Sequence, residues 1–221
     1  MSGNVFTGTP RADTHYLRVK QDLLNGRFEP GTVLLETTLG QLYGVSRTPM
    51  REALARLAHD RLIDRTERGY VVRERSAEEI QAIYEARIPL ESAAASLAAQ
   101  RRGTIDVERL DHLLALRRDE ADHALHAGLN AEFHVALRDA AHSSVMASSL
   151  GQLDDMLTDY RPDRSPSANT ERGFHEHQEI MLAVRDGDSE GARDSMISHL
   201  ERMRDLRIAA HVRRTAREAI R

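Results

Sequence analysis

Apolar residues recur every three or four positions along most of the chain from residue 77 onward, with charged residues between them. This period is typical of an amphipathic α-helix. Glycine, proline and hydroxyl residues interrupt the pattern and separate successive helices. We therefore expect helices over residues 77–102, 105–124, 126–142, 144–160, 170–187 and 189–217.

The first 75 residues have shorter elements. Leu17, Leu23 and Leu24 indicate a helix that starts near Thr14 and ends at Gly26. The residues that follow are rich in glycine and proline and form a turn before the next element.

A short helix is expected over residues 35–43, with Leu39 and Leu42 turned inward. Gly44 allows a sharp turn after it, because glycine adopts conformations that other residues avoid. Ser46 is a favourable N-cap for the helix that comes next.

Pro49 lies in the first turn of this third helix, where its missing N–H costs little. The helix has an apolar stripe at Met50, Ala53, Leu54 and Leu57. Residues 62–65 and 70–72 have the pattern of two short strands around a glycine, which indicates a β-hairpin. Helices, turn and hairpin in this order predict a winged helix-turn-helix.

Ser76 and Glu79 mark the start of the first long helix, because a serine N-cap with a glutamate three residues later forms a capping box. We place a domain boundary here. Residues 12–75 form the winged helix-turn-helix domain, and residues 76–221 form an all-helical bundle of six to seven helices. Residues 1–11 are polar and are expected to be disordered. The predicted fold class is mainly α.

The composition excludes several classes of protein. The chain has 221 residues and no cysteine, so disulfides and thiolate metal ligands are absent. Apolar runs are far shorter than the roughly 20 residues that cross a bilayer, and the N-terminus lacks a signal-peptide pattern. We expect a cytoplasmic protein without a membrane partner.

The charge differs between the two predicted domains. Residues 1–75 carry 12 Arg and Lys against 9 Asp and Glu, whereas residues 76–221 carry 19 against 26. A mildly basic first domain and an acidic second one fit a DNA-reading module joined to a module that does not touch DNA.

Arg47 and Arg51 are four residues apart and share one face of the third helix. An arginine fork matches the O6 and N7 atoms of guanine, and one good pair discriminates between bases by about 1–3 kcal/mol. We expect these two arginines to read bases in double-stranded DNA. Three further arginines either face phosphates or are solvated surface charges: Arg56, Arg61 and Arg65.

The segment GVSRTPMREALARL, residues 44–57, resembles the recognition region of the GntR family of bacterial transcription regulators. Pro30-Gly31, Leu34, Glu36 and Leu39 before it, and RGYVV after it, extend the resemblance over about 60 residues.

This resemblance implies a set of DNA-contacting residues. Two arginines of the recognition helix contact bases, hydroxyl residues contact phosphates or base edges, and the wing tip enters the minor groove. Hydroxyls and the N–H groups at a helix start suit phosphate oxygens. The implied set is Thr37, Ser46, Arg47, Thr48, Arg51, Arg68 and Gly69.

Three of the 11 histidines have a spacing that brings them together. His177 lies 11 residues before Asp188, and His199 lies 11 residues after it. In an antiparallel helical hairpin both imidazoles lie at the same height, about 16 Å from the turn. Asn130 and His134 share a face of another helix and can complete the cluster. Such a set suits a divalent transition metal; a metal-free polar cavity whose histidines bind an effector directly is the alternative.

Residues 77–210 resemble the helical FCD domain of the FadR branch of the GntR family. The resemblance is carried by IYEARIPLESAAASLAA (83–99), NAEFHVALRDAAHSS (130–144), EHQEIMLAVRDGDSEGA (176–192) and MISHLERM (196–203). Metal-binding members have Asp, His, His and His, which correspond here to Asn130, His134, His177 and His199. The resemblance implies zinc, nickel or manganese, with open positions for a small carboxylate effector.

Arg87 is a candidate for binding the effector carboxylate, because a guanidinium pairs with a carboxylate through two hydrogen bonds. An interhelical salt bridge is the alternative. His126 is a further candidate for the lining of the pocket, whereas His175 receives no role. The basic segment 201–221 is either a solvated end of the last helix or a surface that packs on the first domain or a partner subunit.

These patterns predict a DNA-binding transcriptional regulator, which we expect to be a repressor. A homodimer places two heads on a palindromic operator, because half-site symmetry mirrors protein symmetry. The alternative is a metal-dependent enzyme domain fused to a DNA-binding head, since three histidines can also hold a metal-bound hydroxide. We do not favour it, because we find no carboxylate pair with a general-base spacing near the histidines.

Overall fold

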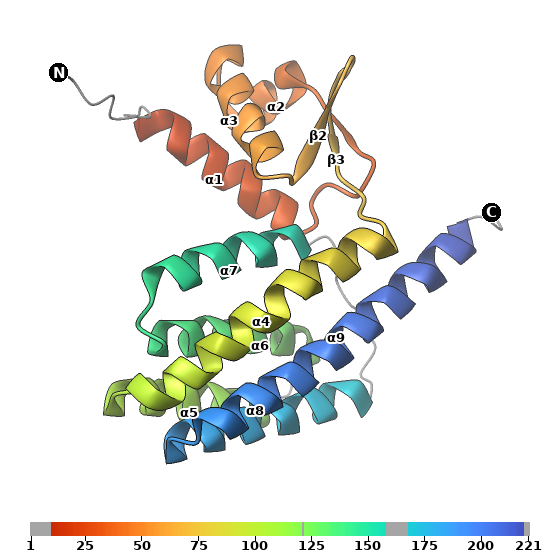
Figure 1. Ribbon diagram of the computed structural model, residues 1–221. Coiled ribbons are helices and arrows are strands. Elements are labelled where there is room, and N and C mark those ends of the chain that lie inside the picture. Colours follow the sequence, from red (N-terminus) through yellow and green to blue (C-terminus); the bar gives the residue numbers. More distant parts are fainter. Residues whose placement is uncertain (1–9, 121, 158–167, 219–221) are drawn as a thin grey trace. The chain divides into compact units, whose positions relative to one another are not determined.

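The computed structural model describes residues 10–120, 122–157 and 168–218 (Figure 1). The chain divides into two compact units that part between Arg75 and Ser76, and a short stretch after Asp154 groups with the first unit. The predicted boundary therefore coincides with the division of the structure. Most of the segment expected to be disordered lies outside the described residues, but Pro10 and Arg11 belong to the first helix.

The first unit has three helices and a small antiparallel sheet among its described residues. Its strand order is β1-β3-β2, so the strand nearest the second unit in sequence lies at the centre of the sheet. The strand β1 was not expected, because two residues are too few to show an alternating pattern. The elements are α1 (Pro10–Leu24), β1 (Val33–Leu34), α2 (Glu36–Tyr43), α3 (Arg47–His59), β2 (Ile63–Thr66) and β3 (Gly69–Val72).

Each helix of the first unit packs one of its faces into a common hydrophobic core. Tyr16, Val19 and Leu23 are spaced by three and four residues on α1 and are buried. The helix α1 begins before the predicted start near Thr14, and its Leu17 faces solvent, whereas the aromatic ring of the neighbouring Tyr16 lies in the core. The whole predicted stripe of α3 is buried, from Met50 to Leu57.

The buried face of α2 also differs by one position from the prediction. Leu39 and Tyr43, one turn apart, are buried, whereas Leu42 is exposed. The hydroxyl of Tyr43 donates a hydrogen bond of 2.5 Å to Asp22 of α1, which satisfies the polar end of a buried ring. Tyr43, with its hydrogen bond to Asp22, therefore takes the inward position that was predicted for Leu42.

The turn between α2 and α3 depends on two glycines. Gly44 ends α2 in the left-handed region with φ 68°, as its place in the sequence predicted. A Cβ on Gly40 would lie 2.7 Å from the carbonyl oxygen of Val45, so this turn needs glycine at position 40. Ser46 has the extended conformation of an N-cap, but its side chain makes no capping hydrogen bond.

The second unit consists of six helices among its described residues, which agrees with the predicted all-helical bundle. Ser76 and Glu79 form the predicted capping box at its start. The predicted helix 105–124 ends earlier, at Asp119, and the next begins earlier, at His123. The helices are α4 (Ala77–Arg101), α5 (Thr104–Asp119), α6 (His123–Ala140), α7 (Ser144–Leu157), α8 (Ala168–Asp186) and α9 (Ser189–Glu218).

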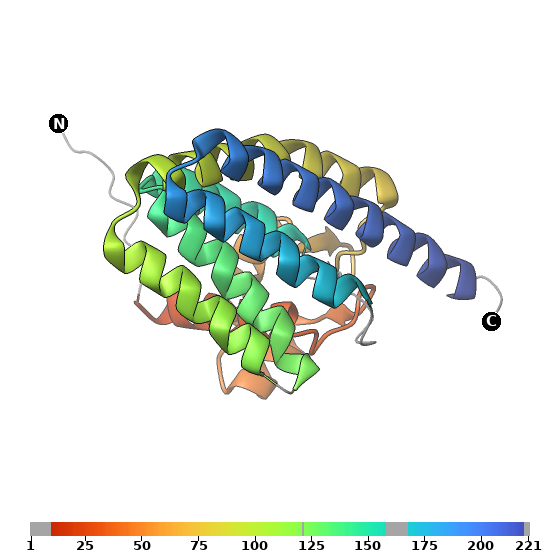
Figure 2. The same cartoon turned by 90° about the horizontal axis from the view of Figure 1, so that it is seen from below.

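The helices of the second unit pack in layers around α4. The helices α4 and α9 run antiparallel side by side, α6 and α8 lie behind them, and α5 covers the far side (Figures 1 and 2). Ala94 of α4 packs against Ala141 and Leu150, which brings α7 onto the bundle. Small residues at these contacts allow the helices to approach closely.

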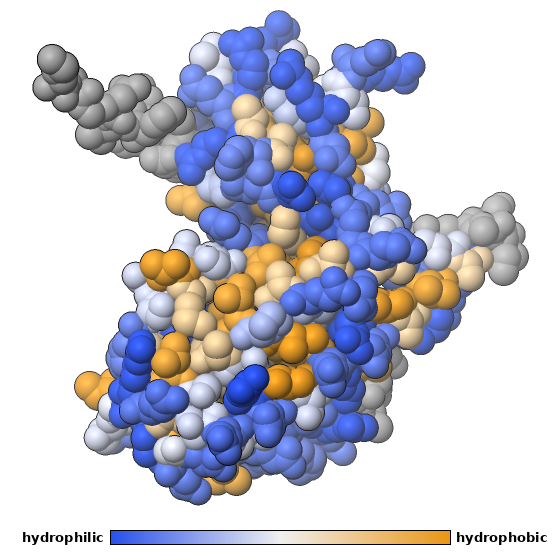
Figure 3. All heavy atoms as spheres, viewed as in Figure 1, coloured by the Kyte–Doolittle hydropathy of each residue, from blue (hydrophilic) through white to orange (hydrophobic). Residues whose placement is uncertain are grey.

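The two units differ in the surface that they show. On the face in Figure 3, the first unit is largely hydrophilic, whereas apolar side chains gather over α4 and α7 of the second unit. The exposed apolar residues of these two helices include Ala82, Ala86 and Val145. Within the described residues, we find no helix that is both long and apolar enough to cross a membrane.

Candidate functional site

The two arginines predicted to read DNA lie on the outer face of α3. Arg47 and Arg51 are exposed, one turn apart, whereas Met50 and Leu54 of the same helix are buried. Neither arginine forms an ion pair with another of the described residues. Their guanidinium groups are therefore available to ligands outside the protein.

Residues from α2 and from the start of α3 surround one groove of about 380 Å³. Thr37, Ser46 and Arg47 line it, so the structure brings together three of the predicted DNA contacts from two helices. Thr48 is exposed beside them. The start of α3 also presents backbone N–H groups without partners inside the helix, which suits a phosphate.

The wing is a tight hairpin. Thr66 of β2 pairs with Gly69 of β3, so the turn between them consists of Glu67 and Arg68 alone. Gly69 has φ 135°, and a Cβ there would lie 2.9 Å from the carbonyl oxygen of Leu34. Glycine is required at this position for both reasons, and Arg68 is exposed at the tip.

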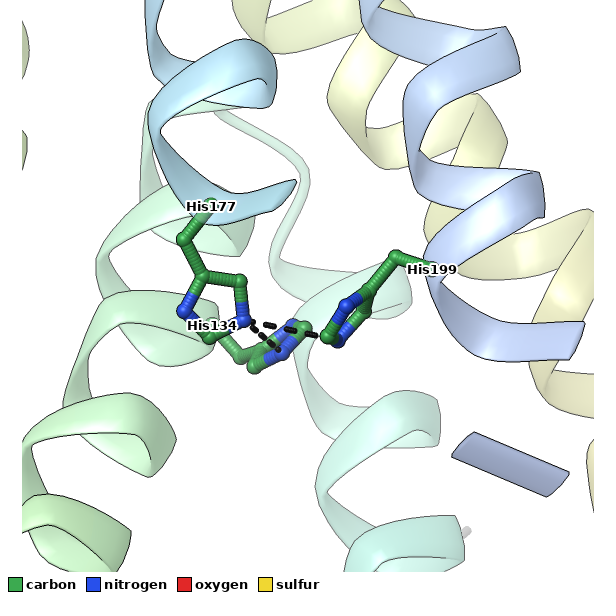
Figure 4. A group of neighbouring side chains, drawn as sticks. All are labelled: His134, His177 and His199. Carbon is green, nitrogen blue, oxygen red and sulfur yellow. Dashed lines mark hydrogen bonds between the residues drawn. The ribbon is translucent and has the colours of Figure 1, made fainter. Parts of the chain in front are cut away.

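Three histidines of the second unit meet in its interior (Figure 4). Nε2 of His177 lies 3.2 Å from Nε2 of His134 and 3.4 Å from Nε2 of His199. His177 and His199 are buried, and His134 is nearly so. The three come from α6, α8 and α9.

The hairpin between α8 and α9 places two of these imidazoles at one height, as the sequence spacing predicted. Gly187 turns the chain with φ 79°, and its N–H donates to the carbonyl oxygen of Val184. Asp188 then caps α9, where its carboxylate accepts the N–H of Gly191 at 2.9 Å. His177 and His199 are consequently opposite each other on adjacent helices.

Burial keeps two of these histidines neutral. Desolvation lowers the pKa of His177 well below its ordinary value, and the nearby His134 and His199 lower it further. Desolvation also lowers the pKa of His199, against an opposing hydrogen bond to Glu176. A neutral imidazole keeps a lone pair for a metal ion, which a protonated one lacks.

The spacing of the nitrogens fits a transition metal. A tetrahedral metal with bonds of about 2.0–2.1 Å to histidine separates its ligand nitrogens by about 3.3 Å. The two Nε2 distances from His177 are close to this value, and one ligand atom of each histidine lies within 4.8 Å of the others. The donor set therefore suits zinc or another borderline cation.

Two glutamates that we did not predict hold the outer nitrogens of this cluster. Glu91 Oε2 lies 3.1 Å from Nδ1 of His134, and Glu176 Oε2 lies 2.8 Å from Nδ1 of His199. Both glutamates stand in the segments quoted above, and Glu176 directly precedes His177. Their partners lie on other helices, so sequence spacing gave no signal for the pairing.

Arginines keep both glutamates ionised. Burial would raise the pKa of Glu91, but the charge of Arg87 and the hydrogen bond from His134 hold it well below the ordinary range. Burial also opposes ionisation of Glu176, yet hydrogen bonds from His199 and Arg202 lower its pKa to about 2. Both side chains are therefore carboxylates and act as acceptors at neutral pH.

Arg87, the predicted effector clamp, is buried and already paired. Its guanidinium donates to Glu91 at 2.9 and 2.5 Å and lies 2.9 Å from Asp154 of α7. Burial alone would lower the pKa of Arg87, but these two carboxylates raise it. The structure thus shows the salt bridge that was the alternative for Arg87, and a role in effector binding stays a prediction.

The remaining predicted residues of this unit have different surroundings. Asn130 is half-buried one turn before His134 on α6, and no hydrogen bond joins its side chain to the histidines among the described residues. His126 is buried and lies 3.2 Å from a guanidinium nitrogen of Arg117. His175 is exposed and lines a hollow of about 790 Å³ between α5 and α8, which none of the three clustered histidines lines.

Two protein families match this chain in the regions where the structure places the two sites. Residues 11–72 match the bacterial regulatory proteins of the gntR family, and residues 82–202 match the FCD domain. The first match contains the exposed arginines of α3, and the second contains all three clustered histidines.

Relatives and solved structures agree with both matches. The chain is 30% identical over 205 residues to the uncharacterized HTH-type transcriptional regulator YdhC of Bacillus subtilis, covering 86% of this chain and 88% of that protein. It is 29% identical to the HTH-type transcriptional repressor GlaR of Escherichia coli, covering 84% and 90%. The fold resembles that of McbR/YncC of E. coli with a TM-score of 0.79 at 20% identity, over 92% of this chain and all of that one.

Both families and these relatives are transcriptional regulators, so the alternative of an enzyme is not supported. The chain belongs to the gntR family of bacterial regulatory proteins and is a DNA-binding transcriptional regulator with an FCD domain.

Proposed function

We propose that this regulator is a repressor that a small carboxylate metabolite releases from a palindromic operator, and that a divalent metal ion in the second unit takes part in binding the metabolite. The observation that carries this proposal is the meeting of three imidazoles in one cluster, of which those of His177 and His199 are buried. A DNA-binding head alone needs no such centre. Because the bacterial chromosome lies in the cytoplasm, we also expect the protein to act there.

The first unit supplies the contacts to DNA. Arg47 and Arg51 extend from the exposed face of α3 and can each pair with a guanine in the major groove. Thr37, Ser46 and Thr48 surround or border the groove beside them, where a phosphate can accept their hydroxyls. At the wing, the absence of a side chain on Gly69 lets the backbone approach the minor groove, and Arg68 adds a positive charge there.

The second unit supplies the centre that responds to the metabolite. His134, His177 and His199 would hold the metal, and a neutral imidazole is the form that a metal binds. A metal ion bound by three histidines provides a Lewis acid with positions left for a carboxylate. Asn130 is placed on the same face of α6 and would supply an amide oxygen; zinc, nickel and manganese are the metals that we expect.

Two further observations support the roles of repressor and dimer. The relative GlaR of E. coli is a transcriptional repressor. The apolar surface over α4 and α7 offers an area that a second copy of the chain can cover (Figure 3). An isologous contact of this kind would give two heads related by a twofold axis, as a palindromic operator requires.

The helix α4 connects the two activities along the chain. It carries Glu91, which bonds His134, and it begins at Ala77, shortly after β3 of the wing ends at Val72. A change in the position of α4 on metabolite binding would therefore reach the wing. The coupling is reciprocal, so operator DNA must weaken metabolite binding by the same factor.

The experiment combines metal analysis with DNA binding. A palindromic site is first selected from random DNA with the purified protein. Elemental analysis and fluorescence anisotropy on this site then compare the wild type with His134→Ala, His177→Ala and His199→Ala, over a panel of small carboxylates. We expect each variant to lose bound metal and to keep binding DNA without responding to the carboxylate that releases the wild type.

His175→Ala is the matched control, because this histidine is exposed on the same helix as His177. It should behave as the wild type in both measurements. Circular dichroism checks that all variants are folded. Full metal occupancy in the three histidine variants would contradict the ligand set, and a wild-type response in a metal-free protein would contradict the role of the metal.

A further inference from the structure

The outer nitrogens of the three clustered histidines have different surroundings. Nδ1 of His134 faces Glu91 at 3.1 Å, and Nδ1 of His199 faces Glu176 at 2.8 Å. Nδ1 of His177 is buried and has no hydrogen-bond partner among the described residues. Two rings are thus fixed by carboxylates, and the third is not.

The ring of His177 is held by stacking instead. It lies against Phe133 of α6, with ring centroids 4.7 Å apart and planes inclined by 19°. Stacking fixes the plane of an imidazole, but it does not select which nitrogen carries the proton. The chain therefore orients this ring in a different way from the other two.

Arginines hold each carboxylate in place. Glu91 is bonded by Arg87 from its own helix, and Arg138 of α6 lies 3.3 Å from the same oxygen. Glu176 receives two hydrogen bonds, of 2.6 and 2.5 Å, from Arg202 of α9. A guanidinium only donates hydrogen bonds, so each carboxylate remains an acceptor and its position is fixed by a planar fork.

We propose that Glu91 and Glu176 are positioning residues that accept the Nδ1–H of His134 and His199 and so direct the unprotonated Nε2 of each ring toward the centre of the cluster. A neutral imidazole has one N–H, so a proton held at Nδ1 leaves the lone pair at Nε2. A carboxylate partner also increases the basicity of a metal-binding imidazole. This inference rests on the proposed metal-binding function and assigns Arg87, Arg138 and Arg202 to holding these carboxylates.

The tautomers can be measured without any metal. Protein labelled with ¹⁵N in its histidine rings is studied by NMR at pH 8 in the presence of a chelator. The signals are assigned with the three histidine variants. We expect His134 and His199 to carry their proton on Nδ1. In Glu176→Gln, the proton of His199 should redistribute between the two nitrogens while His134 stays unchanged, and Glu91→Gln should have the converse effect.

Metal binding gives the second measurement. Titration calorimetry with zinc, and then nickel, should show an affinity about 10–100-fold lower in Glu91→Gln and in Glu176→Gln than in the wild type, as for other partners of metal-binding histidines. Glu179→Gln is the matched control, because this glutamate is exposed on α8 one turn from Glu176. It should change neither the tautomers nor the affinity.

The outcomes separate this inference from the proposed function. Unchanged tautomers and unchanged metal affinity in both Gln variants overturn the positioning role and leave the metal site intact. If each Gln variant changes the tautomer of its own histidine but the wild type binds no metal, the positioning role is supported and the metal dependence is overturned. Glu91 is more deeply buried than Glu176; if Glu91→Gln does not fold, Glu176→Gln alone decides.

Discussion

Arginine serves opposite purposes in the two units of this regulator. In the first unit, Arg47 and Arg51 are exposed and have no ion-pair partner among the described residues. In the second, Arg87 is buried between the carboxylates of Glu91 and Asp154. The first pair is suited to an anion from outside, whereas Arg87 holds anions of the protein itself. Burial and partners within the protein therefore distinguish the roles of these arginines, which the residue type alone does not.

The largest effect is expected from removing the buried arginine. Arg87→Ala removes the cation closest to the buried carboxylate of Glu91 and leaves Arg138 as the remaining arginine that faces both Glu91 and Asp154. Breaking a buried pair in this way costs up to about 3–5 kcal/mol of unfolding free energy. Urea unfolding measures the loss. If Arg87 were an effector clamp without a structural role, the variant would keep its stability and lose only the response to the carboxylate.

Arg109→Ala provides the control for this prediction. Arg109 pairs with Asp139 at 2.7 Å, but both side chains are nearly half exposed. Pairs of this kind contribute about 0–1 kcal/mol because water and salt screen them. A loss of stability in Arg109→Ala as large as that in Arg87→Ala would mean that burial does not distinguish the two arginines.

The exposed arginines should show the reverse behaviour. Replacing Arg47 or Arg51 by Ala removes a guanine contact worth about 1–3 kcal/mol, which corresponds to roughly 5–150-fold weaker binding to the preferred operator. Stability and metal content should not change, because neither side chain is part of a core. Gel shifts on the selected operator and on a base-substituted operator test affinity and preference together.

Arg193→Ala, at an exposed position of α9, controls for the loss of one positive charge. It should bind both operators as the wild type does. Wild-type preference in Arg47→Ala and in Arg51→Ala would remove these residues from base recognition. Weaker binding to both operators by the same factor would assign them to the phosphates instead.

The comparison also explains how far the sequence could predict the structure. The recognition helix, the capping box at Ser76 and the opposed positions of His177 and His199 follow from local rules, because caps and helical turns are fixed by residues close in sequence. The N-terminal strand β1 and the inward position of Tyr43 depend on partners elsewhere in the fold. The residues next to β1 and Tyr43 in the sequence do not indicate which partners these are.

The two glutamates that contact the histidine cluster were not predictable for the same reason. Glu91 and His134 are 43 residues apart, and Glu176 and His199 are 23 apart. Their pairing depends on how α4 meets α6 and how α8 meets α9. The role of Arg87 follows from this pairing, so its sequence context alone left both a clamp and a salt bridge open.

The buried histidine cluster should also make the free energy of unfolding depend on pH, an effect that the exposed Arg47 and Arg51 do not share. Desolvation lowers the pKa of His177 and of His199 in the folded protein, and unfolded histidines titrate near 6.5. Below pH 6.5, the unfolded chain therefore binds more protons than the folded protein does. The contribution of each histidine to the free energy of unfolding is fully present above this pH. It is lost between pH 6.5 and the lower folded pKa, by up to about 1.4 kcal/mol per histidine and pH unit.

Urea unfolding of the metal-free protein between pH 7.5 and 5.5 measures this slope. The carboxylates do not contribute in this window, because the pKa of Glu176 is lowered to about 2 and that of Glu91 also lies below its ordinary range. His177→Leu should reduce the slope by the share of one histidine, whereas His175→Ala, at an exposed position, should leave it unchanged. Equal slopes in His177→Leu and the wild type would show that the folded protein accepts a proton on His177 as readily as the unfolded chain does, and the argument that burial keeps this imidazole neutral for a metal would then be wrong.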